Sequence, residues 1–199
     1  MPSIAMNDLH AALTTQGAAP AHHQRIDLIR SLCEKTPQCL GVALVGSFAK
    51  NTGDRISDLD LAAFVADGRE CEFMGQIDDL IGKSEVLNAY GQVRPGQVAF
   101  RKYVYMDFSS CEFSAFNERL PFRLMRPYIA LWDPRDYLQS LVAEGDPPLH
   151  ETFEPYPHGD EGLIWELVDC IKWLNRGRTE LAKGYLAKLG RALGANSAA

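Results

Sequence analysis

Apolar positions along the chain follow first helical and then strand spacing. Apolar residues at positions 26, 29, 32 and 33 predict an amphipathic helix over residues 22–35. Two short apolar runs follow, LGVALVG at 40–46 and SDLDLAAFV at 57–65, and each predicts a strand. A second helical pattern covers residues 70–82.

The middle of the chain is rich in aromatic and β-branched residues. Three runs separated by turn residues each predict a strand: EVLNAYGQ at 85–92, QVAFRKYVYM at 97–106 and CEFSAF at 111–116. RPYIALWDP at 126–134 predicts an edge strand, and Asp133-Pro134 predicts the start of a short helix through Val142, with Asp133 as N-cap. The predicted fold class is α/β, with a mixed, mostly antiparallel sheet flanked by helices.

The ends of the chain differ from this central part. Residues 1–20, rich in Ala, Thr and Gln, predict a flexible N-terminal arm. The main domain is expected over residues 21–145. The Pro-rich stretch at 145–160 predicts a linker, and two apolar stripes after it predict an antiparallel helical pair, so that 146–199 form a linker and a C-terminal helical pair.

Composition and charge narrow the class of protein. With 46% hydrophobic and 23% charged residues, the chain can bury a core. A formal net charge of -6 disfavours a long nucleic acid as partner. The absence of a long apolar run and of a secretion signal predicts a cytoplasmic protein with no membrane partner. The five cysteines are scattered without a CxxC pair, which predicts free, mostly buried thiols rather than a metal site.

Two carboxylates lie two residues apart in the second predicted strand. Because side chains alternate across a strand, Asp58 and Asp60 project from one face while Leu59 and Leu61 project from the other. Neighbouring carboxylates repel and raise each other's pKa unless a cation lies between them. Magnesium prefers such hard oxygen ligands together with phosphate oxygens. The pair therefore predicts a magnesium site, with manganese as a substitute.

A small-residue turn precedes this pair. A strand that ends at Gly46-Ser47 and turns into a helical segment presents backbone N–H groups that no side chain blocks. With the Ser47 hydroxyl, these donors predict a site for the β- and γ-phosphates of a nucleoside triphosphate. A Gly-Ser turn or an acid pair alone is usually structural. Together, in this order and ten residues apart, they favour a functional site.

Gly46-Ser47, ten residues and then Asp58-Leu59-Asp60-Leu61 resembles the signature of the DNA polymerase β-like nucleotidyltransferase superfamily. The resemblance implies that Gly-Ser opens a helix, that the two acids bind magnesium, and that residues 21–145 are the nucleotidyltransferase domain. The C-terminal helices are similar to those of small antibiotic nucleotidyltransferases of the lincosamide and aminoglycoside types. Many members have Arg-Gly where this chain has Lys50-Asn51, and Lys50 keeps the positive charge.

The superfamily also uses a third carboxylate from a later strand, and two residues compete for this role. Asp107 follows YVYM and is interpreted as a hairpin residue, since turn acids are common. Glu112 lies inside CEFSAF, where a glutamate costs stability unless it has a cation or a donor. This desolvation argument favours Glu112 as the third metal ligand.

Several other polar residues are weaker candidates. Lys172 and Arg176 are within reach of a triphosphate in principle, but a solvated helix face is the simpler interpretation. Glu166 and Asp169 compete with Glu112 as general base for the acceptor hydroxyl. The adjacent histidines at 22–23 are interpreted as exposed residues at a helix start.

The resemblance implies transfer of a nucleoside monophosphate, with AMP from ATP favoured, to a hydroxyl group with the help of two magnesium ions. A small molecule such as an antibiotic is the first choice of acceptor, which would make the protein an antibiotic-resistance enzyme. One alternative is an antitoxin-like adenylyltransferase that acts on a partner protein. Another is a non-catalytic nucleotide-binding regulator. The residues do not specify an oligomeric state.

Overall fold

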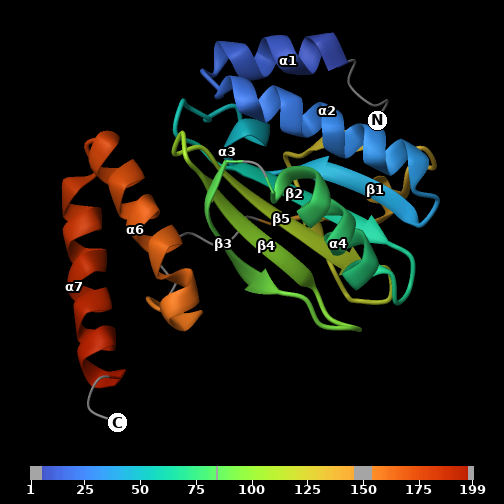
Figure 1. Ribbon diagram of the computed structural model, residues 1–199. Coiled ribbons are helices and arrows are strands. Elements are labelled where there is room, and N and C mark those ends of the chain that lie inside the picture. The colour runs from blue at the N-terminus through green and yellow to red at the C-terminus, as the bar shows by residue number, and fades with distance from the viewer. Residues whose placement is uncertain (1–5, 84, 146–153, 197–199) are drawn as a thin grey trace. The chain divides into compact units, whose positions relative to one another are not determined.

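A six-stranded sheet forms the centre of the larger part of the chain (Figure 1). The computed structural model describes residues 6–83, 85–145 and 154–196. The spatial order of the strands is β3-β4-β5-β2-β1-β7; β2 and β5 pair in parallel, and the other neighbours are antiparallel. The α/β class with a mostly antiparallel sheet is confirmed. The strands are β1 (Cys39–Leu44), β2 (Leu59–Val65), β3 (Val86–Gln92), β4 (Ala99–Tyr105), β5 (Ser110–Asn117) and β7 (Ile129–Trp132).

Helices α2 (Pro20–Lys35) and α4 (Glu70–Ile81) cover one face of this sheet (Figure 1). The apolar stripe predicted for α2 lies in the core, where Ile26 and Ile29 are fully buried. Alternate residues of β2 and β5 point into the same core, which explains why these strands are apolar at every second position. Strand β7 lies at the edge of the sheet, next to β1, as the sequence predicts.

The prediction of a flexible arm over residues 1–20 is wrong for residues 6–15. Residues 6–15 form helix α1 (Met6–Thr15), and Leu9 and Leu13 are both fully buried in the main core. Their spacing of four residues places them on one face of a helix. Two leucines therefore supply enough buried apolar surface to hold a segment that otherwise consists of small and polar residues.

A second, smaller apolar cluster lies on the other face of the sheet and includes Ala62 and Phe64 from β2. It is closed by α5 (Tyr137–Ser140) and a two-stranded parallel pair, β6 (Leu124–Met125) with β8 (Val142–Ala143). The predicted helix over 134–142 is therefore shorter than expected. Asp136 takes a left-handed conformation with φ 54°, so regular helix begins only after it. The Asp133 carboxylate still accepts from the Leu138 N–H at 3.3 Å.

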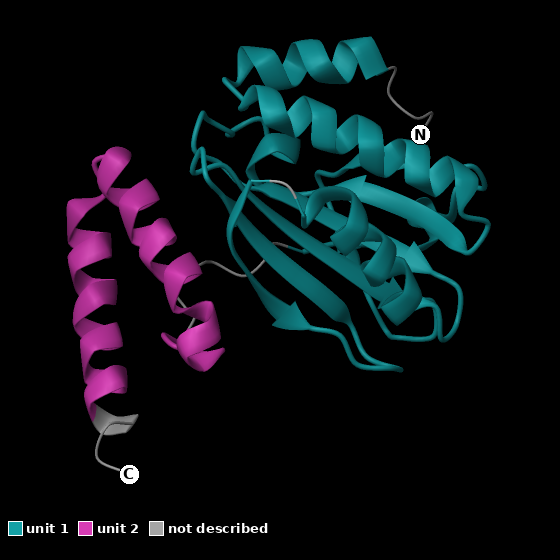
Figure 2. Cartoon of the chain, in the orientation of Figure 1, with its two compact units in different colours: residues 1–146 teal, residues 147–199 magenta. Residues whose placement is uncertain are grey.

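The chain divides into two compact units, Met1–Asp146 and Pro147–Ala199 (Figure 2). The second unit contains the predicted helical pair, α6 (Gly159–Asn175) and α7 (Thr179–Asn196), which reverses at Gly177 with φ +73°. Cys170, Trp173 and Ala182 are buried between the two helices. Of the predicted linker, residues 146–153 lie outside the described residues. Within the part of the chain that the structure describes, no helix is long and apolar enough to cross a membrane.

Candidate functional site

The Gly46-Ser47 turn follows directly from the end of β1. It opens the short helix α3 (Gly46–Ala49), as the sequence predicts. Gly46 has φ +70°, and a Cβ atom at this position would overlap the Asp60 carboxylate. Glycine is therefore required twice, for the left-handed backbone and for the close approach of an acidic side chain. The turn and Asp60 are also joined through the backbone, since the Val45 N–H donates to the Asp60 carbonyl at 2.9 Å.

The residues after α3 keep this turn compact. Lys50 ends the helix and is exposed, and Asn51 takes a left-handed conformation with φ 57°. Asparagine tolerates this region better than most residues, so it suits this position of the turn. The Thr52 N–H then donates to the Ser47 carbonyl at 3.0 Å. The positive charge of Lys50 thus lies close in the chain to the candidate phosphate donors.

The two aspartates lie at the start of β2. Asp58 directly precedes the strand and Asp60 is its second residue, and both side chains are half-buried. A loop braced by its own side chains leads into this position. The Asp54 carboxylate accepts from the Ile56 N–H at 3.0 Å and from the Ser57 hydroxyl at 2.9 Å. The strand therefore begins later than the predicted residue 57, because Ser57 belongs to this loop.

Glu112 lies directly opposite Asp60 on the neighbouring parallel strand. The register pairs Asp60 of β2 with Glu112 of β5, and paired residues project from the same face of a sheet. The flanking residues Cys111 and Phe113 are fully buried on the other face. On the far side of β5, Glu112 pairs in register with Lys102 of β4, and the Lys102 Nζ lies 2.8 Å from Glu112 Oε2. Three neighbouring strands thus carry an acid, an acid and a lysine in one row.

Asp107 lies in the turn between β4 and β5, as the sequence predicts, and is exposed. Its Oδ1 accepts from the Ser109 N–H at 2.9 Å and from the Ser109 hydroxyl at 2.5 Å. Burial alone would raise the pKa of Asp107, but the hydrogen bonds from Ser109 outweigh it, so the pKa of this carboxyl is lowered. Asp107 therefore has a structural role, because its carboxylate stabilises the turn through its hydrogen bonds to Ser109.

His22 is buried rather than exposed, which corrects the sequence interpretation for this residue. Only 1% of it is accessible, and burial lowers its pKa from 6.5 to about 4. Its Nε2 lies 3.1 Å from the Ser57 carbonyl, which can only accept, so Nε2 carries the proton. Nδ1 then accepts from Arg25 at 3.3 Å. A neutral histidine of α2 thus holds the residue before Asp58.

The apolar stripe of α2 contains the signal for this burial. Position 22 lies four residues before Ile26 and seven before Ile29, so it belongs to the same helical face. Arg25 extends the brace. Its guanidinium donates to the Ser109 hydroxyl at 2.9 Å and lies 3.4 Å from the centre of the Tyr105 ring. Helix α2 therefore supports both the loop before Asp58 and the turn before β5.

The donor set fits magnesium in type, because Asp58, Asp60 and Glu112 all offer carboxylate oxygens and Asp60 and Glu112 share one register position. The side chains do not form a complete coordination site: among the described residues, no group of three or more His, Cys, Asp or Glu side chains could hold a metal ion. Glu112 is instead bound to Lys102. The backbone brings the three acids to one end of the sheet, but the Glu112 side chain forms an ion pair with Lys102.

Two of the weaker candidates in the second unit, Glu166 and Lys172, are buried and have hydrogen-bond or ion-pair partners. Glu166 is buried, and its Oε2 accepts from the Tyr156 N–H at 3.0 Å and from the Tyr185 hydroxyl at 2.8 Å. Lys172 is also buried rather than on a solvated face, and lies 3.3 Å from Asp169. Arg176 is exposed, in agreement with the simpler interpretation.

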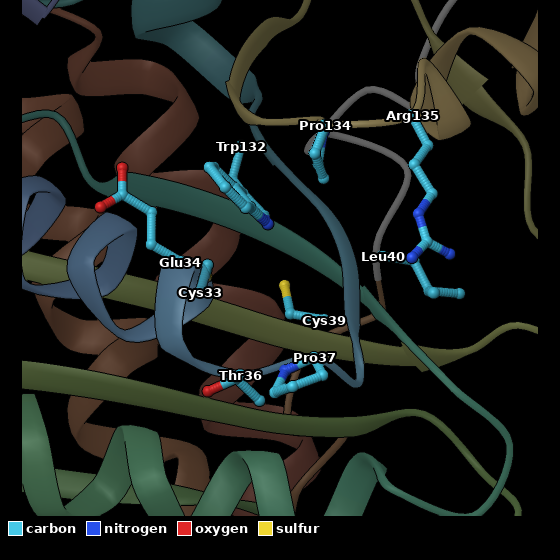
Figure 3. Close-up of a pocket in the computed structure, with 9 residues that line it drawn as sticks. All are labelled: Cys33, Glu34, Thr36, Pro37, Cys39, Leu40, Trp132, Pro134 and Arg135. Atoms are coloured by element: carbon cyan, nitrogen blue, oxygen red, sulfur yellow. The ribbon is translucent and has the colours of Figure 1, made fainter.

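A pocket of about 200 Å³ lies away from these acids (Figure 3). Cys33 and Cys39 line it beside Trp132, so it is at the Cys39 end of β1, whereas Gly46 follows the opposite end of that strand. The hydrogen bond with the Cys39 thiol, and then burial, raise the pKa of Cys33, which keeps it in the unreactive thiol form. The five cysteines are free and four are buried, as predicted.

No protein-family model matches the sequence, and the search of curated proteins found no match. Several solved structures overlap part of the chain. The GLD-2/RNP-8 complex is matched over 55% of this chain and 42% of that chain, with 15% identity and a TM-score of 0.33. Cid1 bound to the UTP analogue UMPNPP is matched over 55% of this chain and 35% of that chain, with 13% identity and a TM-score of 0.35.

A further structure, of the Cid1 poly(U) polymerase, is matched over 55% of this chain and 35% of that chain, with 15% identity and a TM-score of 0.35. The chain thus matches less than half the length of these proteins. Identities and TM-scores of this size carry no argument about activity. The superfamily membership expected from the motif therefore stays a prediction, and a function has to be supported by the residues themselves.

Proposed function

We propose that this protein is a magnesium-dependent nucleotidyltransferase. It transfers a nucleoside monophosphate, with AMP from ATP as the favoured case, to a hydroxyl group of a small molecule such as an antibiotic. The observation that carries the proposal is the meeting of three features at one end of the sheet. Asp60 lies opposite Glu112, and the glycine turn at Gly46 closes directly against the Asp60 carboxylate.

In the proposed reaction, the acceptor oxygen forms a bond to the α-phosphorus of the nucleotide. The bond between that phosphorus and the bridging oxygen breaks, and pyrophosphate leaves. Asp58, Asp60 and Glu112 are the residues that would hold two magnesium ions. Bound there, these ions supply charge neutralisation for the attacking and leaving oxygens.

The other residues of the turn position the triphosphate. Backbone N–H groups at Gly46-Ser47 and the Ser47 hydroxyl are proposed to hold the β- and γ-phosphates, and glycine at position 46 lets this turn lie directly against Asp60. Lys50, exposed after α3, adds a positive charge for the leaving pyrophosphate. Positioning of this kind is the main contribution that a protein makes to phosphoryl transfer.

The acceptor proton goes to a carboxylate, and Glu112 is the best candidate. Its side chain is 34% exposed, so a substrate hydroxyl can approach it. Glu166 is buried and already accepts two hydrogen bonds at one of its oxygens. The Asp169 side chain is only 16% exposed, so it is less accessible to a substrate hydroxyl than Glu112. The formal net charge of -6 favours a small acceptor over a long polyanion.

The proposal is tested by calorimetry of the purified chain with ATP and with GTP. We expect tight binding with magnesium or manganese and weak binding in EDTA, because the carboxylates repel the triphosphate unless a cation lies between them. Asp60→Asn should reduce the metal-dependent part of the affinity. Equal affinity in EDTA and in magnesium would contradict the metal site.

The acceptor is sought with radiolabelled nucleotides and a panel of aminoglycosides and lincosamides. Transfer of label to a panel member supports the small-molecule acceptor. Label on a co-expressed protein instead would indicate a protein adenylyltransferase. Metal-dependent nucleotide binding with no transfer to either class would indicate a nucleotide-binding regulator and contradict the proposed activity.

A further inference from the structure

Lys102 ends the row of charged side chains that crosses three strands. The register pairs Asp60 of β2 with Glu112 of β5, and Glu112 with Lys102 of β4. Residues paired in this way share a face of the sheet, so the lysine and both acids project to the same side. The ammonium of Lys102 lies 2.8 Å from Glu112 Oε2. The carboxylate that the proposed function assigns to a metal is thus bound to a cation of the chain itself.

The ion pair between Lys102 and Glu112 is partly buried. The Lys102 side chain is 18% exposed and that of Glu112 is 34% exposed, so both charges have lost part of their hydration. An ammonium in such a place costs free energy unless a partner compensates it. Lys102 and Glu112 therefore compensate part of each other's charge as long as no other cation reaches the acid. A metal ion that binds Glu112 therefore has to compete with the Lys102 ammonium for this carboxylate.

We propose that Lys102 is a positioning residue that occupies Glu112 in the metal-free protein, and that a divalent cation must displace it to bind Asp58, Asp60 and Glu112. The inference rests on the proposed function, because it requires the metal site. It also agrees with the finding that no group of three described His, Cys, Asp or Glu side chains could hold a metal ion, because Glu112 is paired with Lys102.

The competition has a consequence for the order of binding. Two cations that share one carboxylate repel each other, so Lys102 weakens the binding of a free metal ion. A metal that arrives with a triphosphate also brings negative charge, to which the released ammonium can pair. Lys102 therefore lowers the affinity for metal alone and favours metal that arrives together with nucleotide.

The test measures Mn²⁺ binding without nucleotide, by electron paramagnetic resonance of the free ion and by the shift of the melting temperature. Lys102→Met should raise Mn²⁺ affinity by about threefold to tenfold, because a neighbouring positive charge is removed in a partly screened site. Lys102→Arg should behave as the parent, since it keeps the charge. The melting temperature gained on adding Mn²⁺ should be larger in Lys102→Met than in the parent.

Arg101→Met is the matched control. Arg101 precedes Lys102 in β4, projects from the opposite face and pairs with Asp78 at 3.3 Å. Its loss should leave Mn²⁺ affinity unchanged. Lys102→Gln repeats the test with a polar side chain in case Lys102→Met does not fold.

The outcomes separate the two proposals. Unchanged Mn²⁺ affinity in Lys102→Met and Lys102→Gln, with binding intact in the parent, would overturn the role of Lys102 and leave the metal site standing. An equal rise in Arg101→Met would also overturn it, because the effect would then be one of net charge. No Mn²⁺ binding by the parent or by any variant, with or without ATP, would overturn the metal site of the proposed function and the inference with it.

Discussion

Strand β5 carries polar side chains near each of its ends, and the two clusters are built in opposite ways. Near its last residue, Asn117, the Glu70 carboxylate of α4 is fully buried. It accepts from the Gly96 N–H at 2.5 Å and from the Asn117 amide at 3.2 Å. Toward its start, Glu112 is 34% exposed and faces Asp60 on one side and Lys102 on the other.

The difference teaches what each carboxylate is for. Glu70 is shielded from solvent and held by backbone and amide donors of the chain, so it ties the start of α4 to the loop at Gly96 and to the end of β5. The start of β5 instead gathers two acids and one lysine on a half-exposed face, and such clusters of interacting charges are typical of functional sites. The Glu70 cluster stabilises the fold, and the Glu112 cluster is proposed to bind a metal ion.

The largest expected effect separates the two acids that competed for the third metal position. Glu112→Gln should lower turnover by about 10²- to 10⁴-fold, because both the proton acceptor and a metal ligand are lost. Nucleotide affinity should stay close to that of the parent, since Asp58 and Asp60 still hold the metal that accompanies the triphosphate. Turnover is measured with the acceptor found in the screen, and affinity by calorimetry.

Asp107→Asn is the control, and its turnover should be close to that of the parent. An inactive Asp107→Asn with an active Glu112→Gln would transfer the role to the turn acid. Activity in both variants would contradict a three-carboxylate mechanism.

The next effect concerns the brace behind Asp58. His22 has a pKa near 4 in the folded protein, below its ordinary 6.5, so the unfolded chain binds the proton more tightly. The stabilisation is complete above about pH 6.5 and is lost as pH falls toward 4, which amounts to roughly 3 kcal/mol between about pH 7 and pH 4. His22→Gln keeps a donor for the Ser57 carbonyl but has no proton to bind, and should remove this part of the pH dependence.

Denaturant unfolding at several pH values measures this difference against the parent. His23→Gln is the matched control, because His23 is only half-buried. Its pKa is also lowered, chiefly by burial, but less than that of His22. Equal pH dependence in the parent and in His22→Gln would show that the buried imidazole does not limit stability in acid.

The smallest of the three effects tests the other end of β5. Glu70→Ala should lower the free energy of unfolding by about 2 kcal/mol, because the Gly96 N–H and the Asn117 amide lose their acceptor in a buried place. Nucleotide affinity of the folded variant should not change. Glu72→Ala on the same helix removes an exposed ion pair with Arg69 and should cost less than about 0.5 kcal/mol. Loss of nucleotide binding in folded Glu70→Ala would mean that the two clusters are not independent.

The parts of the molecule that sequence predicts well are those with local causes. The strand containing Asp60 and the turn at Gly46 follow from side-chain alternation and from the conformational freedom of glycine, which neighbouring residues alone define. The exposed Asp107 is predicted correctly for the same reason, because a turn acid serves its own turn.

The remaining features depend on segments that are far apart in the chain. The partnership of Glu112 with Lys102 depends on strand register, which no local pattern of charges specifies. The burial of His22 agrees with its helical spacing, but histidine is usually a partly exposed residue, and only the distant Ser57 carbonyl gives it a buried partner. Helix α1 depends on the burial of Leu9 and Leu13 in the main core, which residues from distant segments build and which the local sequence does not show.

The parallel pairing of β2 with β5 has a kinetic consequence. Asp60 and Glu112 are separated along the chain by α4, β3 and β4, so no hairpin brings them together. Closing such a loop costs entropy before the contact repays it, and topologies rich in these contacts fold slowly. The charged row is thus assembled only once the central strands have met. A chain emerging from the ribosome has both aspartates long before it has the glutamate, and it cannot take up a metal at all three acids until the sheet is nearly complete.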